Sequence, residues 1–225
     1  MNKIFFIAFF FMLGALIEFS CDKDEARQRD HPQIRTNAVN NISAEGARFN
    51  GSIISGDAGS ITEYGFVWGT GEYLSLETSE KIIVQDVPDA STFSYDITFA
   101  LEPMREYHVR SYIKSGDYTI YGDVVTFMSL GSQAPVINDF EPLSATWGDT
   151  ITIYGTNFSY RNGTNSVLFG ENNTLVVEST NEMLRVLVPN SLSDLSSYVS
   201  VEVLGNRTTS SEAFTLISPV IISST

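Results

Sequence analysis

The sequence predicts an all-β protein that is built from two β-sandwiches in tandem. From about Gln33 onward, short runs of alternating apolar and polar residues are separated by Gly, Asn, Asp and Ser, which is typical of half-buried strands joined by turns. No helical period competes with this alternation. The chain has 225 residues, and the part after residue 20 is long enough for two small domains.

Residues 1–20 are expected to be an export signal. Lys3 gives a positive start, and the fourteen residues Ile4–Ile17 form an apolar run, which is too short to span a bilayer because that takes roughly twenty apolar residues. The small Ser20 precedes the only cysteine, Cys21. This arrangement resembles a bacterial lipoprotein signal, which implies that the signal is cleaved and that Cys21 becomes an acylated N-terminus. The alternative for Cys21 is a buried free thiol.

Residues 21–32 are expected to form a flexible spacer behind the lipid anchor, because Asp22–Asp30 contains no large apolar residue. Within this stretch, Lys23–Glu25 resembles the signal of a lysine followed by acids that sends lipoproteins of Bacteroidota to the cell surface. The resemblance implies a protein of the outer membrane that is anchored by lipid and faces the cell exterior.

The composition excludes several classes of function. The chain carries 13 Lys and Arg against 27 Asp and Glu, and this net charge of −14 repels phosphate backbones, so nucleic acid is excluded as a partner. One cysteine cannot form an internal disulfide, and two histidines are too few for a cluster of His and Cys ligands, so we expect no metal and no cofactor. A pair of acids such as Glu102 and Glu106 is interpreted as solvated surface. We therefore predict a protein without enzyme activity.

Residues 33–129 are expected to form the first sandwich, with seven strands between Gln33 and Met128. The clearest alternations run through residues 47–53, 93–99 and 107–113. Trp68 shares its phase with Tyr64 and Phe66, so we predict that it lies in the core.

The segment Leu101–Tyr112, LEPMREYHVRSY, is more specific than the alternation alone. It resembles the turn and following strand of fibronectin type III domains, which implies a tyrosine corner in which the Tyr107 hydroxyl satisfies a backbone group near Leu101. The segments ITEYGFVWGT and YGDVVTF resemble two further strands of the same family. The resemblance covers residues 33–129.

A second sandwich is expected at residues 134–217, after a short linker. The opening APVINDFEPLSATWGDTITIYGTNF and the later segments SVLFG, LRVLVP, VSVEV and EAFTL resemble the immunoglobulin-like IPT/TIG family. Both predicted sandwiches are therefore immunoglobulin-like. Gly155 is expected to permit a bend or a close approach inside a strand, and Pro189 is expected to end one.

Residues 218–225 are interpreted as a tail or as the start of a further repeat. Pro135–Ile137 recurs as Pro219–Ile221, eighty-four positions later, and that spacing is the length of one such domain.

Two aromatic residues are candidate ligand-binding residues. Trp147 lies in the loop before the predicted strand ITIYG, and Tyr160 follows the turn GTNF. Aromatic rings with a polar edge suit contacts with sugars and with proteins. Tyr112 and Tyr121 fall on the phase of their strands that does not face the core. For Trp147, burial in the core is an equally open alternative.

The sequence therefore predicts a non-catalytic surface lipoprotein. The preferred hypothesis is a binding and spacer module that resembles surface glycan-binding lipoproteins and captures a polysaccharide. One alternative is a structural or adhesive stalk that contacts surface proteins. Another is the N-terminal accessory part of a longer surface enzyme, and the fold alone cannot separate these hypotheses.

Overall fold

The computed structural model describes residues 32–56, 60–84 and 91–218. In these ranges the regular elements are strands, apart from the 3-10 turn η2 (Asn162–Thr164), which confirms the all-β prediction. No helix in the described ranges is long and apolar enough to cross a membrane. The predicted signal, Cys21, most of the spacer and the repeat at Pro219–Ile221 lie outside the described residues.

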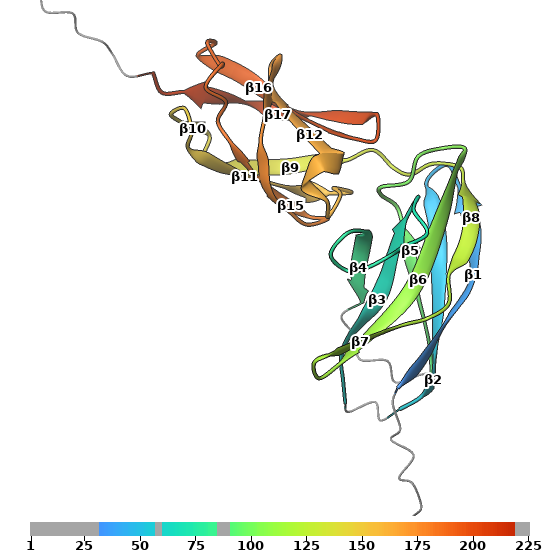
Figure 1. Cartoon of the computed structure of the whole chain (residues 1–225). Helices are drawn as coiled ribbons and strands as arrows, with labels where there is room; N and C mark the ends of the chain where they lie inside the picture. The colour runs from blue at the N-terminus through green and yellow to red at the C-terminus, as the bar shows by residue number, and fades with distance from the viewer. Residues whose placement is uncertain (1–31, 57–59, 85–90, 219–225) are drawn as a thin grey trace, which may run out of the picture.

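The first sandwich consists of two antiparallel sheets that pack face to face (Figure 1). One sheet has the order β1-β2-β5, and the other has the order β4-β3-β6-β7, with β8 also paired to β6. The strands are β1 (Gln33–Ser43), β2 (Gly46–Ser55), β3 (Ile61–Gly69), β4 (Glu80–Val84), β5 (Thr92–Ile97), β6 (Arg105–Ser115), β7 (Tyr118–Tyr121) and β8 (Val125–Ser129).

The described residues of this sandwich hold eight strands where seven were predicted, because the last strand is divided. β7 and β8 pair with successive parts of β6. Between them Gly122 passes so close to β1 that a Cβ atom would lie 2.6 Å from the Thr36 hydroxyl oxygen. The Gly122 amide donates to the Ser111 carbonyl instead of continuing the regular ladder. The close approach of Gly122 to β1 therefore interrupts the predicted last strand and divides it into β7 and β8.

The first core is rich in aromatic rings that meet edge to face. Trp68 has no exposed surface and packs against Phe49 at 5.6 Å and Phe99 at 5.3 Å between ring centroids, so its predicted place in the core is confirmed. The predicted tyrosine corner is confirmed as well, because the Glu102 amide donates to the Tyr107 hydroxyl oxygen at 3.0 Å. The other fully buried apolar residues of this core are Phe66, Ile97, Leu101, Val109 and Ile113.

The strand phase gave a misleading prediction for Tyr112. Its ring points away from the main core but has no exposed surface, because the loop between β3 and β4 folds over that face of the sheet. Leu74 and Leu76 of this loop form a small separate apolar cluster with Tyr112 and Val67. Tyr121 packs against the same cluster, and its hydroxyl oxygen accepts the Leu76 amide at 3.1 Å. Neither Tyr112 nor Tyr121 therefore presents an unpacked aromatic ring to a ligand.

The second sandwich also has two sheets, with the orders β14-β15-β11-β9 and β10-β17-β16-β12-β13 (Figure 1). Its core is aliphatic with three fully buried phenylalanines, Phe158, Phe169 and Phe214. The strands are β9 (Val136–Glu141), β10 (Ser144–Ala145), β11 (Thr150–Thr156), β12 (Asn165–Phe169), β13 (Asn172–Thr174), β14 (Val176–Ser179), β15 (Met183–Leu187), β16 (Ser196–Val203) and β17 (Asn206–Leu216).

Gly155 and Pro189 take the places that the sequence predicted. The β9–β11 register shifts between Tyr154 and Gly155, and a Cβ atom on Gly155 would lie 1.9 Å from the Val136 carbonyl oxygen, so only glycine fits this approach. β15 ends at Leu187, two residues before Pro189.

Candidate functional site

The linker between the sandwiches is attached to the first one. The Ser132 hydroxyl lies 3.2 Å from the Leu101 amide and 3.0 Å from the Leu101 carbonyl, accepting from the first and donating to the second. The Gln133 amide donates to the Thr98 carbonyl at 2.9 Å. Residues 132 and 133 therefore continue the surface of the first sandwich up to the start of the second.

Asn157 connects the second sandwich to this end of the first. It is buried and has a φ of 62°, a left-handed conformation that asparagine tolerates better than most residues. Its side-chain oxygen accepts the Thr98 hydroxyl at 2.8 Å, and its amide nitrogen donates to the Ala134 carbonyl at 3.1 Å. Leu204 adds an apolar contact, because it packs against both cores.

A buried carboxylate makes a second set of contacts between the two sandwiches. We call all the contacts between the sandwiches the joint. Glu80, the first residue of β4, is 6% exposed, and its two oxygens accept the Ser159 hydroxyl at 2.5 Å and the Tyr160 amide at 3.1 Å. β4 lies on the side of the first sandwich that faces the second (Figure 1). Burial raises the pKa of the Glu80 carboxyl, while these two hydrogen bonds and the charge of Arg161 oppose the rise.

The segment of the second sandwich that meets Glu80 is itself held firmly. The buried Asn165 accepts the Ser159 amide at 2.9 Å and donates to the Ser159 carbonyl at 2.8 Å. The Ser179 hydroxyl donates to the Tyr160 carbonyl at 2.8 Å. The second sandwich therefore holds the Ser159 hydroxyl and the Tyr160 amide in place for their hydrogen bonds to Glu80.

A cleft of about 330 Å³ opens beside this carboxylate. Both domains contribute to it, because residues before and within β4 form one wall and residues after β11 form the other. The lining residues are Leu76, Glu77, Ser79, Lys81, Tyr160, Arg161, Asn162 and Gly163. This volume is within the range of small-molecule sites, and we call this feature the joint cleft.

Tyr160 is the aromatic residue of the joint cleft. Its ring packs against the first core, with 6.4 Å between its centroid and that of Phe99, and the Lys81 ammonium lies 6.0 Å from the centroid. Its hydroxyl donates to the side-chain oxygen of Asn181 at 3.1 Å. Burial raises the pKa of the Tyr160 hydroxyl. The ring is half-buried, so an apolar surface with one polar edge borders the cleft.

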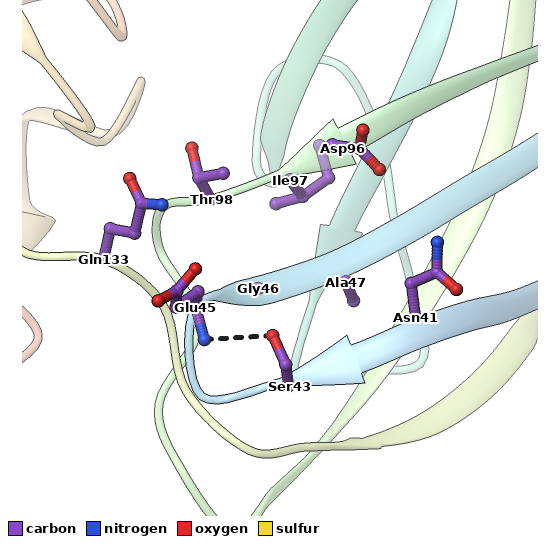
Figure 2. A pocket seen from close by; sticks show the side chains of 9 residues that line it. All are labelled: Asn41, Ser43, Glu45, Gly46, Ala47, Asp96, Ile97, Thr98 and Gln133. Carbon is purple, nitrogen blue, oxygen red and sulfur yellow. Dashed lines mark hydrogen bonds between the residues drawn. The ribbon is translucent and has the colours of Figure 1, made fainter.

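A second hollow lies at the same end of the first sandwich, and Figure 2 shows its lining. Its volume is about 180 Å³, and its lining comes from β1, the turn into β2, the start of β2, the end of β5 and Gln133 of the linker. Asp96 and Glu45 are its charged residues, and Asp96 is paired with Arg48 at 3.2 Å. No aromatic ring lines it among the described residues, so it is less suited to a sugar than the joint cleft.

The structure does not bring the two predicted site residues together. Trp147 precedes the first residue of β11 and Tyr160 follows its last, so a strand of roughly 20 Å separates them. Trp147 is half-buried on the second core, and its indole N–H donates to the Leu192 carbonyl at 2.8 Å. A single sugar residue that contacts Tyr160 in the joint cleft is therefore out of reach of Trp147.

Sequence reasoning missed the charged residues of the joint. Glu80 shares its strand phase with the buried Ile82, and a carboxylate on an apolar phase was a signal that it is buried and bonded. Lys81 and Arg161 gave no signal, because nothing local in the sequence places them on opposite walls of one cleft. His108 is a half-exposed strand residue, and no group of three acidic, His or Cys side chains in the described ranges could hold a metal ion.

Residues 135–216 match the IPT/TIG domain family, so the second sandwich is an IPT/TIG domain. The resemblance of the first sandwich to fibronectin type III domains stays a prediction. No curated protein matches the chain in sequence.

Three similar solved structures illustrate the range of the fold. An auxiliary nutrient binding protein from Bacteroides thetaiotaomicron is 23% identical with a TM-score of 0.35, over 38% of this chain and 21% of that one. SGBP-B from a complex xyloglucan utilization locus in Bacteroides uniformis is 14% identical with a TM-score of 0.33, over 82% of this chain and 49% of that one. The extracellular region of plexin A4 is 14% identical with a TM-score of 0.37, over 88% of this chain and 20% of that one.

These likenesses concern the fold. The chain spans between about a fifth and a half of the length of the three structures. At such low identities and TM-scores neither a ligand nor an activity transfers to this chain.

Proposed function

We propose that this protein is a non-catalytic binding and spacer module of the cell surface that captures a polysaccharide in the joint cleft. The observation that supports the proposal is the cleft itself, which combines the half-buried ring of Tyr160 with amide, hydroxyl and charged groups from both sandwiches. Sugars present an apolar face and a polar rim, and an aromatic ring surrounded by hydrogen-bonding groups matches both.

The lining of the joint cleft supports binding rather than hydrolysis. Glycoside hydrolysis requires two carboxyl groups that flank the scissile bond. Among the described residues that line the cleft, Glu77 is the one acid. Glu80 lies beside the cleft, but both of its oxygens are occupied by Ser159 and Tyr160. A sugar in this cleft would be held without being cleaved.

The spacer role is supported by the contacts that connect the two sandwiches. Because hydrogen bonds and apolar contacts fix the two sandwiches to each other, they would hold the cleft at a set distance from the start of the first sandwich, which the flexible spacer ties to the lipid anchor proposed at Cys21. We expect Cys21→Ser to remain an uncleaved precursor without acyl chains. Labelling with a fatty acid in the native host measures this, and wild-type protein that takes up no label would contradict the anchor.

The glycan role is tested by binding of the purified chain to a panel of polysaccharides in affinity gels. We expect retardation by at least one polysaccharide and a loss of about tenfold in affinity for Tyr160→Ala, because a stacked ring contributes about 1.5 kcal/mol. Asn162→Ala removes a second lining group without touching the ring. Tyr118→Ala is the matched control, since Tyr118 is 72% exposed on β7 and does not line the cleft.

Two outcomes would contradict the glycan role. One is the absence of binding to every polysaccharide by a protein with a normal melting transition. The other is binding that survives Tyr160→Ala and Asn162→Ala but is lost in Trp147→Ala, which would place the site at the opposite end of β11.

A stalk that contacts proteins is the second candidate function, and one observation favours it. The amides of Thr215 and Leu216 donate to the carbonyls of Leu143 and Leu195, which brings together three exposed apolar residues where the chain leaves the second sandwich. These residues are Leu143, Leu195 and Ile217, with exposed fractions of 47%, 62% and 50%. Exposed apolar clusters are typical of protein contacts.

A further inference from the structure

The positive charges of the chain are few, and most are already engaged or scattered. The described ranges contain nine Lys and Arg residues, of which Arg48, Lys114 and Arg185 form ion pairs. Arg110 donates to the Gly122 carbonyl and lies over the Tyr121 ring. The other five are Arg35, Lys81, Arg105, Arg161 and Arg207.

Two of these five cations line the joint cleft, one on each wall. Lys81 comes from β4 of the first sandwich, and Arg161 follows Tyr160 in the second. The Lys81 ammonium contacts the Leu76 carbonyl at 3.4 Å and the Tyr160 ring at 6.0 Å. Arg161 is exposed, and neither cation lies within 4.0 Å of a carboxylate among the described residues.

The two carboxylates nearby attract these cations only at a distance, Glu80 acting on Arg161 and Glu77 on Lys81. Glu80 is buried and holds Ser159 and Tyr160 across the joint. Glu77 is exposed at the rim, and the Ser75 hydroxyl is the main cause of the lowered pKa of its carboxyl, with Lys81 a minor cause. The cations of the cleft therefore retain donors for an anionic group, in a chain that is strongly acidic as a whole.

We infer that the joint cleft selects an acidic sugar, a uronic acid residue whose carboxylate lies between Lys81 and Arg161 while its ring contacts Tyr160. This inference rests on the proposed glycan function and names the class of glycan. An arginine fork and a lysine ammonium are the side chains that bind carboxylates most strongly. The aromatic ring and the amide of Asn162 favour a sugar over an acidic peptide, because they match its apolar face and its hydroxyls.

The test compares ligands that differ only in charge. The purified chain is titrated with polygalacturonate and alginate oligosaccharides, with their methyl esters and with neutral xyloglucan oligosaccharides. We expect at least one acidic oligosaccharide to bind about tenfold more tightly than its ester, and Lys81→Gln and Arg161→Gln each to remove about tenfold of that affinity. Arg35→Gln is the matched control, because Arg35 is exposed on β1 of the other sheet.

The outcomes separate this inference from the function on which it rests. Equal affinity for acid and ester, or unchanged affinity in both glutamine variants, overturns the charge selection but leaves a glycan-binding cleft. Tighter binding of oligoglutamate than of any sugar overturns the choice of a sugar. Binding of no oligosaccharide by the folded chain overturns both proposals.

Discussion

Replacing Glu80 by alanine is expected to uncouple the two sandwiches. The substitution leaves the Ser159 hydroxyl and the Tyr160 amide without their acceptor, and an unsatisfied buried group costs about 1–3 kcal/mol. We expect a loss of about 2–4 kcal/mol in the free energy that couples the sandwiches. Scanning calorimetry measures this as the separation of one cooperative transition into two. A single transition at the wild-type temperature would contradict a joint held by Glu80.

Replacing Glu80 by glutamine is expected to remove the pH dependence of the same joint. Burial raises the pKa of the folded carboxyl above its ordinary value of 4.5, so the folded state binds the proton more tightly than the unfolded state. This contribution to stability is fully present below pH 4.5 and is lost as the pH rises through the raised pKa. At neutral pH wild-type Glu80 is therefore a buried charge that its partners only partly compensate.

Glu80→Gln keeps one acceptor oxygen, for the Tyr160 amide, without that charge, and the Ser159 hydroxyl can donate to the Arg161 carbonyl at 3.3 Å instead. We expect it to be at least as stable as wild type at neutral pH, and the difference in melting temperature between the two proteins to shrink on acidification. The difference isolates Glu80 because every other titrating group is common to both proteins. A difference that does not change between pH 4 and pH 7 would contradict the raised pKa.

The alternation of residues predicted the main cores well, because each strand of a sandwich buries one face. Trp68 was identified from its phase alone, and Tyr107 from a local motif whose hydrogen bond spans five residues. The same reasoning failed for Tyr112, because a loop that carries Leu74 and Leu76 covers the outer face of its sheet. Phase describes which side of a strand a residue occupies, and it does not describe what covers that side.

The joint cleft could not be predicted, because its contacts join residues that are remote in sequence. Glu80 and Ser159 are 79 positions apart and belong to different sandwiches. Tyr160 was found because its place after a strand suggested an exposed ring, yet nothing in the sequence showed that it would lie beside Lys81. Patterns within a strand report on one sandwich at a time, whereas a site between two sandwiches depends on how they dock.

The central claim is that one ligand site is shared by both sandwiches, and hydrogen exchange of the purified chain with and without its tightest-binding oligosaccharide tests it most directly. We predict that the ligand slows amide exchange in residues 76–81 of the first sandwich and in residues 160–163 of the second together, with no change in residues 146–149 around Trp147. Slower exchange confined to one sandwich, or centred on Trp147, would contradict a site at the joint.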